Sequence, residues 1–360
     1  MTQIPVYIGS YTAKLPFVDG KSEGICLYHL DQQAGTLTYI SQTTGLLNPT
    51  YQTLHPNGRY LYSVSEGLGD EAVITAFEIN AETGFLTYLN EQSAHGDFPC
   101  HLNVDQTGQH LIIANYGSGS VVVYPLAGNG HLGKRSQFIQ HEGGTMVNPE
   151  RQEGPHAHCI QFDANNNFVF VADLGLDKLM IYQLDRQQGQ LQPAAQPWIE
   201  AAPGAGPRHL AWHPSGDYLF LINELGSTIM SLAYDKATGR LQTLDTVSTL
   251  PENFAGESTC AAVRVAPSGK FVYGSNRGHD SIASFTFDAN TGRLTSTGHT
   301  LTQGQTPRDF NIDPSETFLL AANQDTDTVV TYRINPDDGT LQKTGVVSEI
   351  MTPVCLTFAG

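Results

Sequence analysis

Hydrophobic and polar residues alternate along most of this chain in short runs, and turn residues separate one run from the next. In the segment GRYLYSVSE, which begins at Gly58, apolar and aromatic side chains alternate with the others, and this is the periodicity of a β-strand. Pro56-Asn57-Gly58 supplies a tight turn, because proline fixes φ and glycine tolerates positive φ. We find no sustained helical period. The pattern predicts an all-β protein.

One unit of strands and turns is repeated about seven times. It contains an apolar strand, a Pro/Asp-x-Gly turn, a second strand that ends in Asn or Asp, a third strand, and a Thr-Gly hairpin to a fourth. Its first turns lie 47 to 58 residues apart, and a period of this length with four strands is typical of β-propellers. The clearest copies begin at Thr50, His209, Ala261 and Asp309, and weaker copies begin at His101 and His158.

The two ends of the chain are complementary fragments of this unit. Pro5–Thr44 matches the second to fourth strands, whereas Pro353–Phe358 matches only the first. Six internal units and one divided unit predict a seven-bladed β-propeller with four-stranded antiparallel blades, in which the terminal strands share a blade and close the ring. Because each blade needs its neighbours to bury its faces, we expect residues 1–360 to form a single domain.

Composition excludes several classes of protein. The chain has 18 Lys and Arg against 35 Asp and Glu, and its net charge of −17 argues against nucleic-acid and anionic-membrane partners. No apolar run is long enough to span a membrane, and the N-terminus lacks the pattern of a signal peptide, so we expect a cytoplasmic protein. The five cysteines are widely spaced without a C-x-x-C pair, which predicts reduced and mostly buried thiols.

Polar side chains are expected to converge where the first strand of each unit begins and the second strand ends. Antiparallel pairing places these two positions side by side. The residues just before the second position are Asn, Asp or Ser in every unit, and we interpret them as caps of backbone groups. The remaining positions vary between units, and in one part of the predicted channel mouth they are His158, Arg208, Glu224, Arg277 and Arg308.

This cluster indicates a site for an anionic ligand, since three arginines occupy equivalent positions in a chain with few basic residues. The alternative is a network of Arg–Glu ion pairs that bridges neighbouring blades. The long segment His141–Cys159 adds Arg151, Glu153 and His156, and a long loop in a regular fold is often functional. His156 and His158 form an H-x-H pair, but no Cys, Asp or Glu set completes a metal site. We therefore expect neither a metal nor a cofactor.

At these residues the chain resembles the seven-bladed lactonase family, which includes cycloisomerase-type bacterial 6-phosphogluconolactonases and fungal carboxy-cis,cis-muconate cyclases. The resemblance covers the whole chain, including the divided blade. The motifs that carry it are NPERQEGPHAH from Asn148, GAGPRHLAWHPSGDYLFLINEL from Gly204, SNRG from Ser275 and TPRDFNIDPS from Thr306. The hallmark residues of the family correspond here to His158, Arg208, Glu224 and Arg277.

Two of these correspondences have a competitor in the sequence. Strand register favours His158 as the family histidine, whereas alignment on the preceding Gly-Pro favours His156. Arg264 lies near Arg277 and competes with it. Asp309, directly after a Pro-Arg pair, is a residue that the resemblance does not require. We expect the substrate to be bound by further residues of the same mouth, namely Arg308, Arg151 and His156.

The resemblance implies hydrolysis of 6-phospho-D-glucono-1,5-lactone in the oxidative pentose phosphate route. Such hydrolysis needs an activated water and a group that stabilises the developing oxyanion. Either His158 or Glu224 is expected to be the general base, and Arg208 and Arg277 to bind the oxyanion, the phosphate, or both. A covalent serine mechanism is disfavoured because the chain has no G-x-S-x-G nucleophile elbow.

Two other functions remain open from the sequence. A muconate-type lactonising cyclase would use the same acid, base and arginines. A non-catalytic propeller that binds a ligand or a protein is the second, because the fold does not determine the function, and an exposed apolar face would favour it. We expect a small anionic sugar lactone as the ligand and a monomeric protein, since the divided blade closes the ring.

Overall fold

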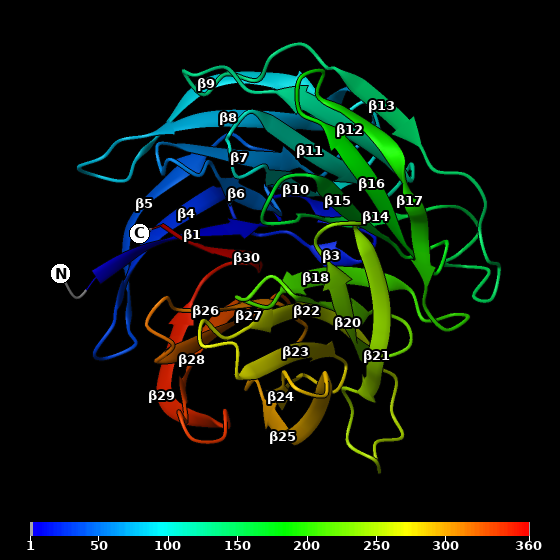
Figure 1. Ribbon diagram of the computed structural model, residues 1–360. Helices are drawn as coiled ribbons and strands as arrows, with labels where there is room; N and C mark the ends of the chain where they lie inside the picture. Colours follow the sequence, from blue (N-terminus) through cyan, green and yellow to red (C-terminus); the bar gives the residue numbers. More distant parts are fainter. Residues whose placement is uncertain (1–2, 360) are drawn as a thin grey trace. The chain divides into compact units, whose positions relative to one another are not determined.

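The computed structural model of the chain describes residues 3–359 and has the fold of a seven-bladed β-propeller (Figure 1). Within this range the strands form seven four-stranded sheets, which are the blades, and one two-stranded hairpin. A single 3-10 turn at Gly69–Glu71 is the only helical segment of the described residues, and none of their helices could cross a membrane. The predicted all-β fold is confirmed.

Six blades follow one another along the chain, each with its four strands in sequence order. The first three are β6 (Gln52–Leu54), β7 (Tyr60–Ser65), β8 (Val73–Ile79) and β9 (Leu86–Ser93); β10 (Pro99–Val104), β11 (His110–Asn115), β12 (Ser120–Pro125) and β13 (Gln137–Gln140); and β14 (Ala157–Phe162), β15 (Phe168–Asp173), β16 (Lys178–Asp185) and β17 (Gln190–Glu200). The next three are β18 (Pro207–Trp212), β19 (Tyr218–Asn223), β20 (Thr228–Asp235) and β21 (Arg240–Ser248); β22 (Thr259–Val265), β23 (Phe271–Arg277), β24 (Ser281–Asp288) and β25 (Arg293–Leu301); and β26 (Pro307–Ile312), β27 (Phe318–Asn323), β28 (Thr328–Ile334) and β29 (Leu341–Glu349).

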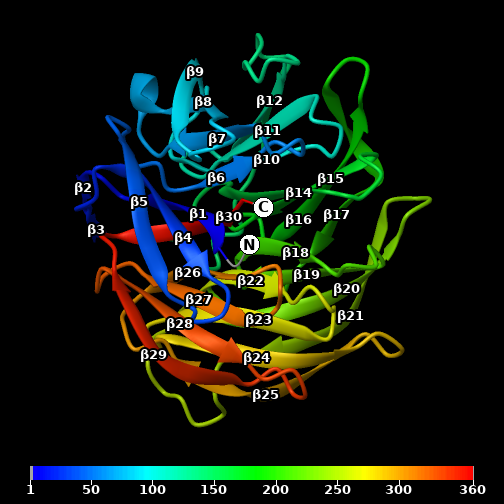
Figure 2. The ribbon, with the colours of Figure 1, turned by 90° about the vertical axis from the view of Figure 1, so that its left-hand side faces the viewer.

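The seventh blade contains both ends of the chain. Its strand order is β30 (Pro353–Phe358), β1 (Gln3–Ser10), β4 (Gly24–Asp31) and β5 (Leu37–Thr44), and red β30 lies beside blue β1 (Figures 1 and 2). In the antiparallel register, Val6 is opposite Phe358 and Ile8 is opposite Leu356. The sharing of one blade by the terminal strands is therefore confirmed. A small hairpin of β2 (Lys14–Leu15) and β3 (Val18–Asp19) interrupts this blade between β1 and β4.

The backbone contacts divide the chain into two compact units. Unit 1 comprises Met1–Gly45, Leu210–Ala233 and Gln242–Gly360, and unit 2 comprises Leu46–His209 and Tyr234–Leu241. Unit 2 contains the three blades from β6 to β17, and unit 1 contains the blade of the terminal strands and the two blades from β22 to β29. The expected organisation of residues 1–360 as one domain stays a prediction.

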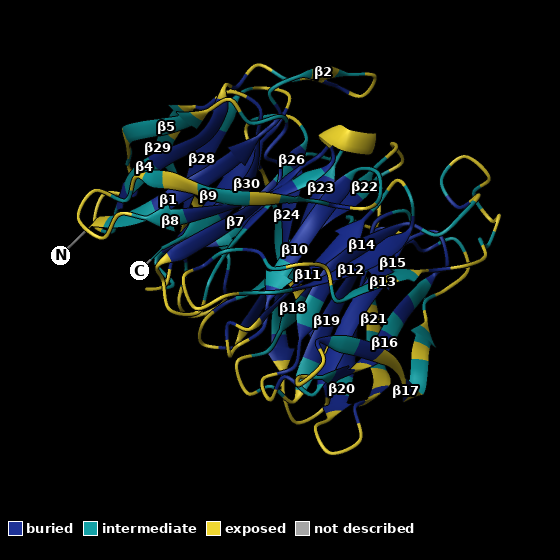
Figure 3. Cartoon of the chain, turned by 90° about the horizontal axis from the view of Figure 1, so that it is seen from above, coloured by how far each residue is buried: buried dark blue, intermediate teal, exposed yellow. Residues whose placement is uncertain are grey.

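Hydrophobic cores lie between consecutive blades within each unit. One core of unit 2 joins Tyr62 of its first blade to Leu111 of the second, and one core of unit 1 joins Tyr273 to Tyr332 of the next blade. Four of the second strands are buried along their whole length, namely β7, β11, β15 and β27. The fourth strands, such as β9 and β17, are largely teal and yellow in Figure 3 because they are partly exposed. Burial of apolar area between the sheets, at roughly 25 cal/mol per Å², is the main stabilising contribution.

A side chain holds the turn between the first and second strands. The carboxylate of Asp163 accepts the backbone N–H groups of Asn167 and Phe168, both at 2.7 Å. Where the turn begins with His-Pro, the Nδ1 atom of His55 accepts the N–H of Asn57 at 3.1 Å. The Nε2 atom of His55 then faces the carbonyl oxygen of Gly108 in the next blade at 3.0 Å. The cysteines are also as predicted, since all five are buried thiols outside any disulfide: Cys26, Cys100, Cys159, Cys260 and Cys355.

Deletion of residues 353–360 should strongly destabilise the protein. The deletion removes one of the two strands that pair with β1 and three buried side chains of β30, Val354, Cys355 and Leu356. Because each large buried aliphatic side chain contributes about 2–5 kcal/mol, the free energy of unfolding should fall by more than about 5 kcal/mol. Thermal melting followed by circular dichroism measures the loss.

A circular permutant provides the matched control. The N–H of Ala359 donates to the carbonyl of Pro5 at 2.9 Å, so a short linker can join the two ends, and new termini can be opened in the exposed turn at Glu82–Thr83. The permutant should melt near the wild-type temperature. A deletion variant that melts with the wild type would show that β30 is not needed to complete its blade.

Candidate functional site

The first strands carry an extra residue at the position where the sequence predicts the site. Along β14, Ala157 is opposite Asp173 and Cys159 is opposite Ala172, so His158 is the extra residue of a β-bulge. Arg308 occupies the same position between Pro307 and Asp309. Cys100 and Val354 are the equivalent residues of two further blades. A β-bulge redirects a side chain out of the regular alternation, and such bulges are frequent beside active sites.

The residue that follows the second strand lies beside the bulge. The backbone N–H of Tyr116 donates to the carbonyl of Phe98 at 2.9 Å, and that of Gln324 donates to Thr306 at 3.0 Å. Each acceptor lies two residues before the bulge residue of its own blade. The two sets of positions singled out in the sequence therefore meet at one end of these blades, as antiparallel pairing predicts.

The ring of short polar residues has the structural role expected of it. The side-chain amide of Asn115 donates to the carbonyl of Ala94 at 3.0 Å, and that of Asn276 donates to Thr249 at 2.7 Å. In the third blade the carboxylate of Asp173 accepts the N–H of His156 at 2.8 Å. In these three blades the side chains satisfy buried backbone groups, as expected of caps, whereas Asn223 donates to the Thr228 hydroxyl at 2.9 Å and the Ser10 hydroxyl has no partner among the described residues.

In unit 2, three of the predicted residues gather around Tyr116. The ring of His156 stacks on the Tyr116 ring with 4.5 Å between centroids, and the ring of His158 meets it edge-on at 5.6 Å. The guanidinium of Arg151 donates to the Tyr116 hydroxyl at 3.1 Å. The long loop therefore brings Arg151 and both histidines to the end of one second strand.

The two histidines of the H-x-H pair have different surroundings. Nδ1 of His156 lies 2.8 Å from the carbonyl oxygen of Tyr116, and its Nε2 lies 3.2 Å from the carboxylate of Glu153. Both ring nitrogens of His156 thus face groups that anchor the loop. His158 is 5% exposed at the bulge, and its ring meets that of His209 at 5.2 Å. These surroundings favour His158 for chemistry and His156 for positioning the loop.

Sequence reasoning missed a row of aromatic rings that continues from His158 and His209. The ring of His101 lies 5.6 Å from that of His209 and stacks on Tyr51 at 4.1 Å. The Nε2 atom of His101 also lies 3.3 Å from the sulfur of Cys159. His101 directly follows the bulge residue Cys100, and His209 directly follows Arg208, one of the predicted site residues, and this placement is the signal that could have identified them.

Asp177 fixes the backbone that leads to Arg208, and this residue was also missed. Its two carboxylate oxygens accept the N–H groups of Gly204 at 2.6 Å and Gly206 at 2.8 Å. Gly206 has a φ of 66°, a conformation that favours glycine and that accounts for the second glycine of Gly-Ala-Gly-Pro-Arg. The side chain of Gln152, in the long loop, donates to the same carboxylate at 2.8 Å. Asp177 therefore holds the approach to Arg208 and the loop before His158 together within unit 2.

In unit 1, Glu224 and Arg277 form an ion pair between consecutive blades. Arg277 ends β23, and its guanidinium lies 3.1 Å from the carboxylate of Glu224, which follows β19 and is 3% exposed. The same guanidinium donates to the carbonyl of Cys260 at 2.7 Å. One Arg–Glu ion pair that bridges two blades is therefore present. Burial raises the pKa of the Cys260 thiol to about 12, so this thiol stays protonated near neutral pH.

Arg264, the competitor of Arg277, has a different partner. Its guanidinium lies 2.7 Å from one carboxylate oxygen of Asp309, whose other oxygen accepts the N–H of Leu356 at 2.9 Å. Asp309 is 1% exposed, so this carboxylate connects three consecutive blades of unit 1 from within. The ion pair with Arg264 accounts for the presence of Asp309 after the Pro-Arg pair. Arg277, and not Arg264, is therefore the arginine beside Glu224. Arg308 lies over the ring of Tyr11 at 5.5 Å from its centroid.

Comparison with known proteins agrees with this fold and sequence. The family model described as lactonase, 7-bladed β-propeller, matches residues 5–358. A 6-phosphogluconolactonase of Bacillus subtilis (strain 168) is 38% identical over 316 residues, which cover 88% of this chain and 87% of the relative. A 6-phosphogluconolactonase of Formosa agariphila is 34% identical over 316 residues and 86% of each chain. The solved structure of a periplasmic gluconolactonase from Pseudomonas aeruginosa has a TM-score of 0.92, with 29% identity and 99% of both chains covered.

Substitution of Asp177 by alanine should destabilise unit 2. The substitution removes three hydrogen bonds to a buried carboxylate, and their donors would lose their partner. Because a hydrogen bond to a charged group contributes about 1.5–3 kcal/mol, we expect the free energy of unfolding to fall by at least about 2 kcal/mol. Urea denaturation measures this change.

Asp185→Ala is the matched control. Asp185 lies in the same blade and accepts two turn N–H groups, those of Gln187 at 2.9 Å and Gln188 at 3.1 Å, but it is less buried. Its loss should cost less than about 1 kcal/mol, as for other partly exposed caps. Equal losses for the two variants would contradict the role of Asp177.

Proposed function

The chain belongs to the lactonase family of seven-bladed β-propellers and is a lactone hydrolase, and we propose that its substrate is 6-phospho-D-glucono-1,5-lactone. The observation that carries the proposal is the 38% identity to the Bacillus subtilis 6-phosphogluconolactonase over most of both chains. The product would be 6-phosphogluconate, as in the oxidative pentose phosphate route. A second relative of the same name supports the same substrate.

The proposed catalytic residues are His158, Arg208, Glu224 and Arg277. His158 takes a proton from a water molecule as that water attacks the lactone carbonyl carbon. Arg208 stabilises the oxyanion of the tetrahedral intermediate, because a guanidinium matches such oxygens geometrically. When the intermediate collapses, the bond from the carbonyl carbon to the ring oxygen breaks. The proton on His158 passes to that oxygen, and the ring opens to a hydroxy acid.

The local surroundings support these roles. His158 is the extra residue of a β-bulge, which turns its side chain out of the regular alternation. An imidazole group can act as a general base near neutral pH. Glu224 is already engaged by Arg277, so we assign Glu224 to charge stabilisation and orientation rather than to proton removal. Arg208 is 2% exposed, and the glycine-rich segment before it is held by Asp177. Arg308 and Arg151 are proposed to bind the substrate, and His156 is proposed to position the loop that carries Arg151.

The cellular location and the oligomeric state stay predictions. The sequence favours a cytoplasmic monomer, whereas the relative from Pseudomonas aeruginosa is named as a periplasmic protein. Fractionation of the source cells and analytical ultracentrifugation of the purified protein would decide the two points.

His158→Ala and Glu224→Gln should each lower kcat on 6-phosphogluconolactone. Loss of the proposed general base in His158→Ala should cost about 10²–10⁴-fold and remove the limb of the pH–rate profile near neutral pH, whereas Glu224→Gln should lower kcat because its charge stabilisation is lost. The measurement is the disappearance of enzymatically generated lactone, corrected for its spontaneous hydrolysis. His29→Ala and Glu349→Gln are controls that should keep wild-type rates. If the two residues serve one substrate molecule, the double variant should be far less impaired than the product of the single effects.

Arg208→Ala distinguishes oxyanion stabilisation from phosphate binding. An arginine that serves the oxyanion should lower kcat by about 10²–10³-fold on both 6-phosphogluconolactone and plain glucono-1,5-lactone. An arginine that grips phosphate should instead impair only the phosphorylated lactone, chiefly through KM. We expect the first result.

EDTA should leave the rate of the wild-type protein unchanged. Absence of activity of the wild type on either lactone and on carboxymuconate would refute the enzymatic assignment.

A further inference from the structure

A cleft lies beneath the β2–β3 hairpin, which is an addition to the regular blade. The hairpin connects β1 to β4 and is anchored by a small core in which Tyr11, Val18 and Val354 are buried. The exposed ring of Phe17 meets the Tyr11 ring edge-on at 6.0 Å. The space between the hairpin and the segment after β27 is about 400 Å³, within the range of small-molecule sites. We call this space the hairpin cleft.

The buried amide of Gln324 points into the hairpin cleft with an unused acceptor. Gln324 is 2% exposed, and its Nε2 atom donates to the carboxylate of Asp325 at 2.8 Å. A carboxylate accepts only from the NH₂ end, so this bond determines the orientation of the amide. The Oε1 atom is buried and accepts no hydrogen bond from any described residue. A buried acceptor without a donor is unfavourable, and a ligand hydroxyl group would supply the donor.

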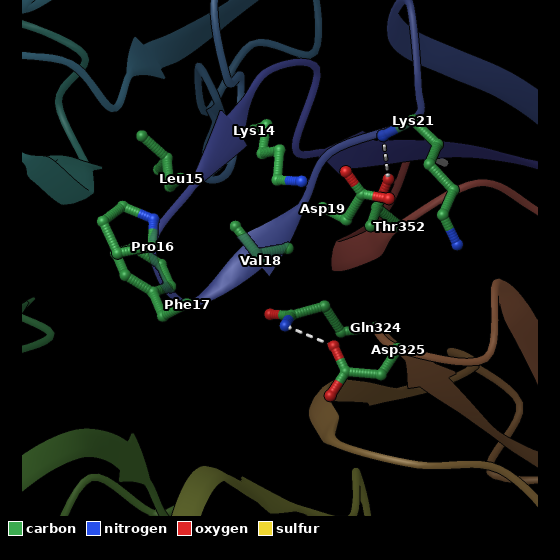
Figure 4. A pocket seen from close by; sticks show the side chains of 10 residues that line it. All are labelled: Lys14, Leu15, Pro16, Phe17, Val18, Asp19, Lys21, Gln324, Asp325 and Thr352. Carbon is green, nitrogen blue, oxygen red and sulfur yellow. Dashed lines mark hydrogen bonds between the residues drawn. The ribbon is translucent and has the colours of Figure 1, made fainter.

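Lys14 supplies the available positive charge of the hairpin cleft. Two lysines line the cleft, but the ammonium group of Lys21 is paired with Asp327 at 2.6 Å. Within residues 3–359 the side chain of Lys14 has neither an ion pair nor a hydrogen bond. Lys14 and Gln324 both line this space, and the Lys14 side chain extends beside Asp19, its partner across the hairpin (Figure 4). An ammonium group at the rim and a buried acceptor below it suit a ligand that carries both an anionic group and hydroxyl groups.

Within unit 1, the hairpin cleft belongs to the blades that come after the proposed catalytic residues Glu224 and Arg277 in the sequence. Gln324 comes directly after β27, the position that Arg277 occupies at the end of β23 in the preceding blade. The first strands of these two blades, β22 and β26, contact each other, and β26 in turn contacts β30 of the hairpin-bearing blade. Arg277, Gln324 and Tyr11 are therefore equivalent positions of three consecutive blades. The hairpin cleft lies one blade beyond the Glu224–Arg277 pair.

We propose that the hairpin cleft binds the hydroxylated, phosphorylated end of the sugar lactone, with Lys14 contacting the phosphate and Gln324 accepting a sugar hydroxyl. This inference rests on the proposed function and identifies where the enzyme distinguishes phosphorylated from plain lactone. Asp19 and Asp325 offer further acceptors to hydroxyl groups at the same cleft. Contacts at this end are made equally in the ground state and the transition state, so they should act on KM more than on kcat.

Lys14→Met tests the phosphate contact, because it removes the charge and keeps the length of the side chain. With 6-phosphogluconolactone, kcat/KM should fall about 10- to 100-fold, the range expected for loss of one charged contact. With glucono-1,5-lactone it should stay at the wild-type value. Lys343→Met, an exposed lysine on β29 of the same unit, should change neither. Gln324→Leu should instead lower kcat/KM for both lactones, because both carry the hydroxyl groups.

The outcomes separate this inference from the proposed function. If Lys14→Met has no effect, or impairs both lactones equally, the phosphate contact is refuted while lactonase activity stands. If the wild type hydrolyses neither lactone, the proposed function is refuted. Calorimetry with 6-phosphogluconate and gluconate then tests separately whether the cleft binds the phosphate. Tighter binding of 6-phosphogluconate than of gluconate, abolished in Lys14→Met, would support the cleft. Equal or absent binding of the two acids would overturn it. Melting temperatures confirm that each variant is folded.

Discussion

The packing of each β-sheet against the sheet of the next blade is the interaction on which the rest of the structure depends. The cores of both units combine apolar side chains from two consecutive blades, and second strands such as β7 and β27 have no exposed residue. Hydrogen bonds strengthen the same contacts, since the Tyr62 hydroxyl donates to Gly130 of the next blade at 3.0 Å and the Tyr273 hydroxyl to Gly339 at 2.8 Å. Because the faces of the strands are used for this packing, polar chemistry is confined to the ends of the blades.

The β-bulges allow one strand to contribute side chains to the core and also to carry a polar side chain at the end of the blade. One extra residue interrupts the alternation of the first strand just where it meets the end of the second, and the side chain there is free to be polar without disturbing the core. The bulge residue is Cys100, His158 or Arg308 in different blades, so one backbone device presents different chemistry. Neighbouring polar groups then restrain these side chains, as Tyr116 does beside His158.

Two segments depart from the repeat, and both bring further side chains to the ends of their blades. The loop of His141–Cys159 carries Arg151 and His156 to Tyr116, and the β2–β3 hairpin covers a cleft beside Gln324. Both additions lie at the same end of their blades as the bulges. A regular propeller offers equivalent positions in every blade, whereas a substrate with one reactive carbonyl and one charged end is asymmetric. Each addition makes its own blade different from the others.

The sequence by itself determined the blades, the divided seventh blade and the positions of the candidate residues. Alternation of side chains and turn residues acts over a few neighbours in the chain, so these features can be read from a single repeat. Only the tertiary structure decided the bulges, the pairing of Arg264 with Asp309, the row of rings from Tyr51 to His158 and the free acceptor of Gln324. These features join residues that lie far apart in the sequence, and their geometry depends on how sheets pack, which a local period does not encode.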